Sequence, residues 1–268
     1  MKYVPLKRGK LAYIDRGKGP PIVLVHGFPL DHTMWNAQID ELANTHRVIA
    51  PDVRGFGQSP LGEVDPNRGI TMEEFADEIA EMLDALEIHG LVVYVGLSMG
   101  GYVGWQFVRK YSNRLRALIQ LDTRAIADSD EARAGRLQMA ENVADWGSER
   151  VAEMMAPKLF STNALETRPE LMEDLRRVVG RTPPATIAAV QRGLAARPDV
   201  TAQLLAVRVP TLIIVGEFDA ISPPTEMQAI ANAIPGATFV EIPNAGHMTT
   251  VEKPAAVNAA LEEFLARL

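Results

Sequence analysis

Cysteine is absent from this chain of 268 residues. The protein therefore has no disulfide framework, no thiolate ligand for zinc or an iron–sulfur cluster, and no cysteine nucleophile. Excess positive charge is also missing, since 27 Lys and Arg stand against 34 Asp and Glu and give a net charge of −7. A surface that binds nucleic-acid phosphates needs clustered positive charge, so we expect no nucleic-acid partner.

Long hydrophobic runs are missing as well. The longest apolar stretches, such as Leu91–Val95 and Thr211–Val215, are far shorter than the roughly 18 residues that a membrane helix needs. The charged N-terminal residues are not followed by a continuous apolar stretch, which is unlike a secretory signal. We therefore expect a cytoplasmic protein with no membrane partner.

The residues that are present favour a globular core, because 47% are hydrophobic and only 23% are charged. Short runs rich in Val, Ile and Leu show no in–out alternation, which is typical of strands covered on both faces. Such buried strands are predicted at Ile22–Val25, Val48–Ala50, Leu91–Val95, Leu115–Leu121 and Thr211–Val215. Outer strands are predicted at Leu11–Asp15 and Thr238–Ile242.

Helical patterns alternate with these runs. Thr71–Leu86 has apolar residues at steps of three and four, and Thr71 with Glu74 forms a capping-box pattern. Pro254–Leu268 repeats the helical spacing. The alternation predicts an α/β fold, with a mostly parallel, doubly wound sheet and helices on both faces.

One long segment, from residue 123 to residue 207, contains no convincing strand. It carries four helix-like pieces, at Glu131–Asp145, Glu149–Met155, Glu170–Val179 and Ala185–Ala195. We interpret it as a helical insertion between two strands of the sheet. Because it leaves the sheet at the carboxyl end, where open α/β sheets bind ligands, we expect it to cover a binding site as a cap.

A sharp turn with a serine at its tip is predicted where the strand Leu91–Val95 ends. The sequence there is Gly96-Leu97-Ser98-Met99-Gly100, and the helical pattern Tyr102–Tyr111 follows. Glycines two residues away on each side let such a turn close without Cβ clashes. The pattern is typical of a nucleophile elbow, which presents a serine hydroxyl above the N-terminus of a helix.

Five short motifs occur in one consistent order along the chain. They are His26-Gly27-Phe28-Pro29, Asp52–Ser59, Gly96–Gly101, Gly216–Asp219 and Asn244–His247. On these motifs the chain resembles the α/β-hydrolase fold over essentially its full length, and it looks most like small capped carboxylesterases and 3-oxoadipate enol-lactonases. The resemblance implies a catalytic core formed by residues 1–122 and 208–268, with residues 123–207 as the helical cap.

The resemblance also implies a catalytic triad. Its nucleophile is Ser98, and its base is His247, the one of five histidines that follows the last predicted strand. Asp219 follows the strand Thr211–Val215, which gives the chain order serine, acid, histidine of this fold. Asp122, at the end of the strand Leu115–Leu121, remains the alternative acid.

Two backbone N–H groups are expected to stabilise the oxyanion. One is that of Met99, the residue after the nucleophile. The resemblance assigns the other to Phe28, and it makes His26 a residue that braces this loop. Gly55 and Gly57 do not form a dinucleotide motif, because Pro60 stands where a third glycine is needed. No metal-ligand spacing occurs, so we expect no cofactor and no metal.

These features predict a serine carboxylesterase that cleaves small, largely apolar esters through an acyl-enzyme. Serine at the elbow argues against haloalkane dehalogenases and the usual epoxide hydrolases, which use aspartate there. An enol-lactonase, a C–C bond hydrolase, a cofactor-free perhydrolase and a ligand receptor on the same fold remain open. Arg124 is interpreted as a surface salt-bridge residue or as the partner of a lactone's carboxylate. The expected partner is the ester alone, and the chain is a monomer or a homodimer. The candidate pocket residues are Phe28, Trp35, Met139, Trp146, Met154 and Met155.

Overall fold

A single eight-stranded sheet forms the centre of the computed structural model, which describes residues 1–268. The strands lie in the order β1-β2-β4-β3-β5-β6-β7-β8. Their bounds are β1 Lys2–Leu6, β2 Gly9–Arg16, β3 Pro21–Val25, β4 Arg47–Pro51, β5 Val92–Leu97, β6 Leu115–Leu121, β7 Thr211–Gly216 and β8 Thr238–Ile242. β2 pairs in antiparallel fashion with both β1 and β4, and the five remaining pairs are parallel, which confirms the predicted α/β class.

The buried strands lie where the apolar runs predicted them, and β8 is an outer strand as expected. The prediction that Leu11–Asp15 forms an outer strand is wrong, because β1 pairs with β2 and takes the edge itself. The sequence did not predict β1, because an edge strand needs little burial and therefore has no apolar run. Val4 is its one buried residue.

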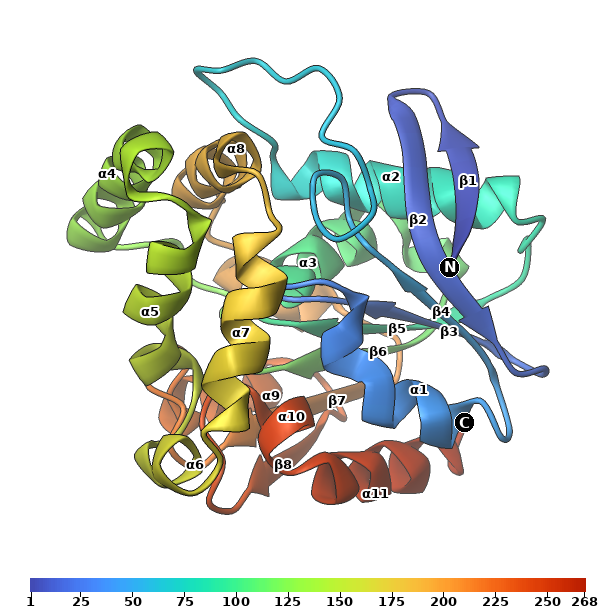
Figure 1. The fold of residues 1–268 in the computed structure, drawn as a ribbon. Helices are drawn as coiled ribbons and strands as arrows, with labels where there is room; N and C mark the ends of the chain where they lie inside the picture. Colours follow the sequence, from blue (N-terminus) through green and yellow to red (C-terminus); the bar gives the residue numbers. More distant parts are fainter.

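Helices cover both faces of the sheet (Figure 1). α2 (Met72–Ala85) packs against α3 (Met99–Tyr111), while α1 (Asn36–Leu42) packs against α11 (Pro254–Leu265) on the other side. α9 (Pro224–Ala233) connects β7 to β8. The predicted capping box is present, since Thr71 Oγ1 accepts from the Glu74 N–H at 3.2 Å and Glu74 Oε2 accepts from the Thr71 N–H at 3.0 Å.

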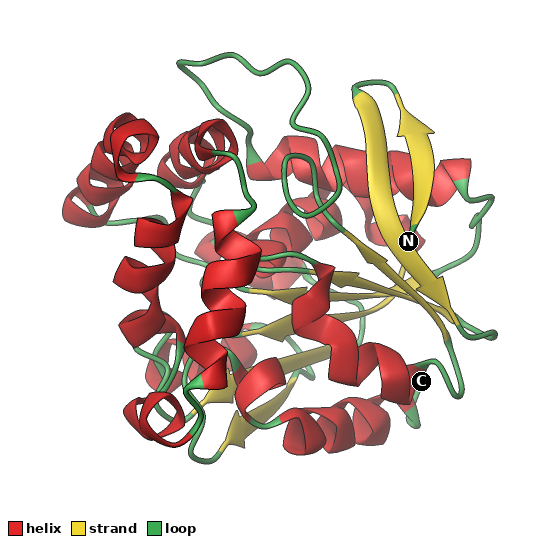
Figure 2. Ribbon diagram, in the orientation of Figure 1, coloured by secondary structure: helices red, strands yellow, loops and turns green.

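The chain between β6 and β7 contains helices and loops but no strand, as the sequence predicted. It contains α4 (Asp130–Trp146), α5 (Ser148–Leu159), α6 (Thr162–Thr167), α7 (Glu170–Gly180), α8 (Pro184–Ala195) and the 3₁₀-helix η3 (Thr201–Ala206). α4 packs against α8 and α5 packs against α7, and together they stand beyond one end of the strands (Figures 1 and 2). Buried residues of these helices, including Val143, Val151 and Ile187, belong to the same apolar core as the sheet.

No helix of the structure is both long enough and apolar enough to cross a membrane.

Candidate active site

Ser98 occupies a strained turn between β5 and α3. Its backbone angles are φ 53° and ψ −111°, in a region that favours glycine, and it is the N-cap residue of α3. Gly96 and Gly100 make the turn possible, because a Cβ on Gly96 would overlap the Gly100 carbonyl oxygen and a Cβ on Gly100 would overlap that of Val25. Ser98 itself is partly exposed between buried neighbours, so its hydroxyl is accessible.

Hydrogen bonds from the neighbouring strand hold this turn in place. The Ser98 N–H donates to the Leu121 carbonyl at 2.9 Å, and Thr123 Oγ1 donates to the Ser98 carbonyl at 2.8 Å. Inside the turn, the Tyr94 hydroxyl donates to the Gly100 carbonyl at 2.8 Å. The serine is therefore fixed by β5 and by the end of β6 together.

His247 and Asp219 form a buried pair near the same end of the sheet. Nδ1 of His247 lies 2.8 Å from Oδ2 of Asp219, and the two residues are 1% and 3% exposed. Oδ1 of Asp219 accepts from the N–H groups of Ile221 and Ser222 at 2.8 and 2.9 Å. Since Nδ1 is engaged by a carboxylate, Nε2 remains free to exchange a proton. The Ser98 hydroxyl does not form a hydrogen bond with His247 in this structure.

Asp122, the alternative acid, faces other partners. Its Oδ1 accepts from the Gly216 N–H at 2.9 Å, and its Oδ2 accepts from the Thr249 hydroxyl at 2.5 Å. Burial and the nearby charge of Asp219 raise the pKa of Asp122 well above its usual value, although the Thr249 and Gly216 donors oppose the shift. The histidine is therefore bound to the acid that follows β7, and Asp122 braces the two loops that carry Asp219 and His247.

Two backbone N–H groups beside Ser98 have no acceptor within the protein. They belong to Phe28, in the loop after β3, and to Met99, the first residue of α3. Both residues are buried, at 5% and 1% exposure. The loop lies against the elbow, because a Cβ on Gly27 would be 3.4 Å from Cβ of Ser98. Buried donors without acceptors are rare in folded proteins, and they are the feature that an oxyanion site requires.

His26 is bound on both sides of its ring, which agrees with its interpretation as a bracing residue. Nδ1 donates to the Gly27 carbonyl and Nε2 accepts from the Val53 N–H, each at 3.0 Å. The tautomer is assigned from the partners: the Gly27 carbonyl can only accept and the Val53 N–H can only donate, so the proton of the neutral ring is on Nδ1. Burial lowers the pKa of His26, which favours that neutral form. With both nitrogens occupied, His26 cannot act as the base.

Asp31, His32 and Asp52 each offer one possible metal-ligand atom, and these three atoms lie within 4.8 Å of one another, close enough to hold a metal ion. Their hydrogen bonds serve the loop instead. Oδ1 of Asp52 accepts from the N–H of His32 at 2.9 Å and lies 2.6 Å from its Nδ1, while Oδ2 accepts from Gln58. Burial alone would lower the pKa of His32, but the hydrogen bond to Asp52 and its charge raise it. The loop with Gly55 and Gly57 thus braces the sheet end.

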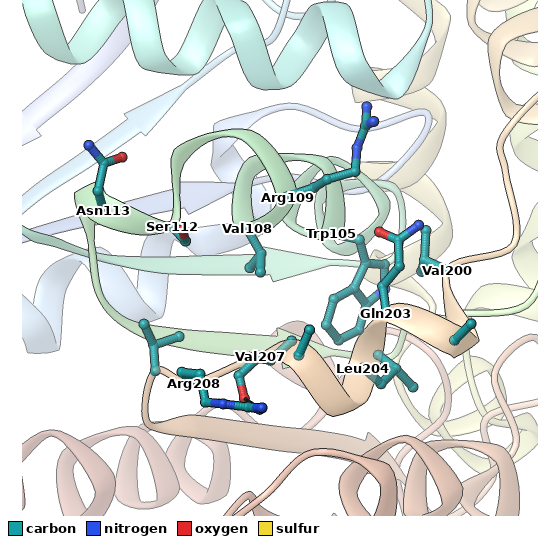
Figure 3. Close-up of a pocket in the computed structure, with 13 residues that line it drawn as sticks. Trp105, Val108, Arg109, Ser112, Asn113, Val200, Gln203, Leu204, Val207 and Arg208 are labelled. Carbon is teal, nitrogen blue, oxygen red and sulfur yellow. Dashed lines mark hydrogen bonds between the residues drawn. The ribbon is translucent and has the colours of Figure 1, made fainter.

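Two hollows bear on the question of a substrate pocket. The larger, about 740 Å³, lies between α3 and η3, where Trp105 and Val108 face Leu204 and Val207 (Figure 3). No residue of the Ser98, Asp219 and His247 set lines it. A smaller one of about 130 Å³ lies between Met248, Leu30 and helix α7, and Ser98, Asp219 and His247 do not line it either.

Two of the candidate pocket residues, Trp35 and Met154, do not have the partial burial expected of a pocket lining. Trp35 is fully buried in the core and Met154 is 43% exposed, so the expectation that both shape a pocket is not supported.

Arg124 makes a bidentate ion pair with Glu226, with Nε to Oε1 at 2.8 Å and Nη2 to Oε2 at 2.9 Å. Its guanidinium is therefore already neutralised by a protein carboxylate.

Comparison with known proteins agrees with this fold. The chain belongs to the alpha/beta hydrolase fold family, whose sequence profile matches residues 20–254. The solved structure of a thermophilic esterase from Thermogutta terrifontis is 46% identical, with a TM-score of 0.93 over 99% of this chain and 98% of that one.

Two curated relatives carry different activities. The 3-oxoadipate enol-lactonase 2 of Acinetobacter baylyi is 27% identical over 92% of this chain and 89% of its own length. The haloalkane dehalogenase 2 of Mycobacterium tuberculosis is 30% identical over 96% of this chain and 91% of its own length.

Proposed function

We propose that this protein is a serine carboxylesterase that cleaves small, largely apolar carboxylic esters through an acyl-enzyme. The observation that carries the proposal is the Ser98 elbow at the same sheet end as the buried Asp219–His247 pair. In this proposal residues 1–122 and 208–268 form the catalytic core and residues 123–207 the cap.

The first step is attack of Ser98 Oγ on the ester carbonyl carbon. Nε2 of His247 takes the hydroxyl proton as the bond forms, and the Asp219 carboxylate at Nδ1 stabilises the imidazolium that results. The step needs Oγ and Nε2 to come within hydrogen-bond distance when substrate is bound, since such contacts often tighten only in the complex.

The carbonyl oxygen becomes an oxyanion, which accepts from the free N–H groups of Phe28 and Met99. When the tetrahedral intermediate collapses, the alcohol leaves with the proton held by His247. Water then attacks the acyl group with His247 as base again, and the carboxylic acid is released from Ser98.

An enol-lactonase is the second candidate, because it would use the same three residues and because a curated enol-lactonase is among the relatives. The esterase is preferred because the solved esterase shares 46% of its sequence with this chain. Arg124 also gives no free cation for a lactone carboxylate, since Glu226 already binds it. Dehalogenation is not proposed, because residue 98 is a serine and the resemblance implies an aspartate nucleophile in that group.

The test is a panel of p-nitrophenyl esters from acetate to laurate, measured beside 3-oxoadipate enol-lactone. We expect turnover of the short esters and its loss in Ser98→Ala, with the fold retained by circular dichroism. A phosphonate probe should add mass at Ser98 of the wild-type protein. Wild-type turnover in Ser98→Ala would disprove the serine mechanism, and a strong preference for the enol-lactone would replace the esterase by the lactonase.

A further inference from the structure

The residues on either side of His247 both donate backbone hydrogen bonds. Gly246 binds the side chain of Glu252, which also binds the inserted segment and is called the Glu252 clamp below, and Met248 binds the inserted segment directly. The Gly246 N–H donates to Oε1 of Glu252 at 2.9 Å, and the Met248 N–H donates to the Leu159 carbonyl at 3.0 Å. Leu159 is the last residue of α5. His247 thus lies in a short loop, residues 244–248, whose backbone is anchored immediately before and after the imidazole.

The carboxylate of Glu252 bridges two segments of the chain, one of which contains Ser161, 91 residues away from Glu252. While Oε1 binds Gly246, Oε2 accepts from the Ser161 N–H at 3.1 Å and from the Ser161 hydroxyl at 2.6 Å. Ser161 is the N-cap residue of α6, and its Oγ also accepts from Ala164 at 3.2 Å. One oxygen therefore holds the His247 loop and the other holds the start of an inserted helix.

The two segments also touch directly. A Cβ on Gly246 would lie 2.6 Å from the Ser161 nitrogen and 2.9 Å from the carbonyl carbon of Phe160, so no other residue fits there. Glu252 and Ser161 are 7% and 5% exposed. Bonds to an ionised acceptor are about twice as strong as neutral ones, and a buried group that loses its partner costs its full desolvation. Separation of the segments is therefore unfavourable.

We propose that Glu252 is a positioning residue that couples the segment Leu159–Ser161 to the loop of His247. The catalytic part of this inference rests on the proposed function. Glu252 reaches neither the substrate nor the imidazole, and it acts through the backbone of Gly246. If the inserted helices move at Leu159–Ser161, the base moves with them, so the covering helices and the base adopt their working positions together.

The kinetic test is Glu252→Gln, which keeps the side-chain size but has one acceptor oxygen instead of two. Either the Gly246 N–H or the two donors of Ser161 must then lose their acceptor oxygen. We expect kcat for p-nitrophenyl acetate to fall about 10- to 100-fold with KM changed less than about twofold, since small displacements of a base act on the chemical step. The control is Glu170→Gln, which changes an exposed carboxylate at the start of α7 and should match wild type. An unchanged kcat, or a rise in KM alone, would overturn the proposal.

Hydrogen exchange tests the coupling without any activity. In Glu252→Gln the amides of Ser161, Gly246 and Met248 should lose protection together, while those of β5 keep it. Ser161→Ala removes the hydroxyl bond to Glu252 and the cap on the Ala164 N–H but keeps the bond from the Ser161 N–H. It should give the same pattern more weakly, which keeps the test valid if Glu252→Gln folds poorly. Faster exchange in one segment alone would refute the coupling. A wild type without turnover but with coupled exchange would instead contradict the proposed function.

Discussion

Nδ1 of His247 lies 2.8 Å from Oδ2 of Asp219, and the second buried carboxylate nearby, that of Asp122, binds Gly216 and Thr249 instead. Two like charges so close disfavour each other, and burial with the charge of Asp219 raises the pKa of Asp122 well above its usual value. Burial and the charge of Asp219 therefore disfavour the charged form of Asp122, and Asp219 is the acid that contacts the imidazole.

The first prediction separates the two carboxyl groups by activity. Asp219→Asn should lower kcat by about 10³- to 10⁴-fold, because the amide favours the wrong tautomer of His247. Asp122→Asn should lower it by less than about tenfold, because Asp122 does not contact His247 and its raised pKa favours the neutral form, which an amide resembles. Steady-state rates of ester hydrolysis at neutral pH give both values. Equal losses in the two variants would show that Asp122 shares the role of the acid.

Asp122 also makes a prediction about stability and pH. Its folded pKa lies above the unfolded value of about 3.9, so the folded state binds more protons and this contribution falls as pH rises through the interval between them. Asp122→Asn has no such proton to lose. Its free energy of unfolding should therefore rise relative to wild type as pH increases above about 4. Urea unfolding across that range measures the difference, and parallel curves for the two proteins would contradict it.

A third prediction concerns the glycines of the elbow. Gly100→Ala should lower the free energy of unfolding by about 1–3 kcal/mol and impair turnover, because its Cβ would overlap the Val25 carbonyl oxygen. Gly135→Ala is the matched control, since Gly135 lies inside α4 with nothing within 4 Å of the added Cβ. That change should stabilise the protein by about 0.5–1 kcal/mol. Urea denaturation distinguishes the two, and equal effects would argue against a steric requirement at the elbow.

A buried ion pair beneath the loop after β4 supports a fourth prediction. Nε of Arg54 lies 2.7 Å from Oε1 of Glu78, but without hydrogen-bond geometry, so neither carboxylate oxygen of Glu78 has a donor. Burial raises the pKa of Glu78 to about 7 in spite of the attraction of Arg54. Because the folded pKa is raised, the stability contributed by this acid is lost as pH rises from its unfolded value toward about 7.

Arg54→Met removes the attraction that lowers the pKa of Glu78, so this pKa should rise further. The folded state should then continue to lose stability up to a higher pH than in the wild type. We expect a penalty of about 3–5 kcal/mol at about pH 8.5 and a smaller one at about pH 5.5, where Glu78 is protonated. Arg16→Met is the control, since Arg16 pairs with Asp40 at the exposed surface and should cost less than about 1 kcal/mol at either pH. A penalty of Arg54→Met that does not change with pH would contradict the argument.

The sequence by itself determined the features whose causes are local. Apolar runs predicted the central strands, the Thr71–Glu74 spacing predicted where α2 begins, and the glycines around Ser98 predicted the elbow. These signals work because strand burial, helix capping and turn geometry depend on residues only a few positions apart. The roles of Ser98, Asp219 and His247 were implied by the resemblance to the α/β-hydrolase family, and each of these residues follows a recognisable strand.

Only the tertiary structure decided which distant groups meet. The choice of Asp219 over Asp122 as the partner of His247 depends on how β6, β7 and β8 lie side by side. The bond of Thr249 to Asp122 joins residues 127 positions apart, that of Arg124 to Glu226 joins residues 102 apart, and the Glu252 clamp joins residues 91 apart. No periodicity or spacing marks such pairs, because their energy arises only when packing removes both groups from water and brings them together.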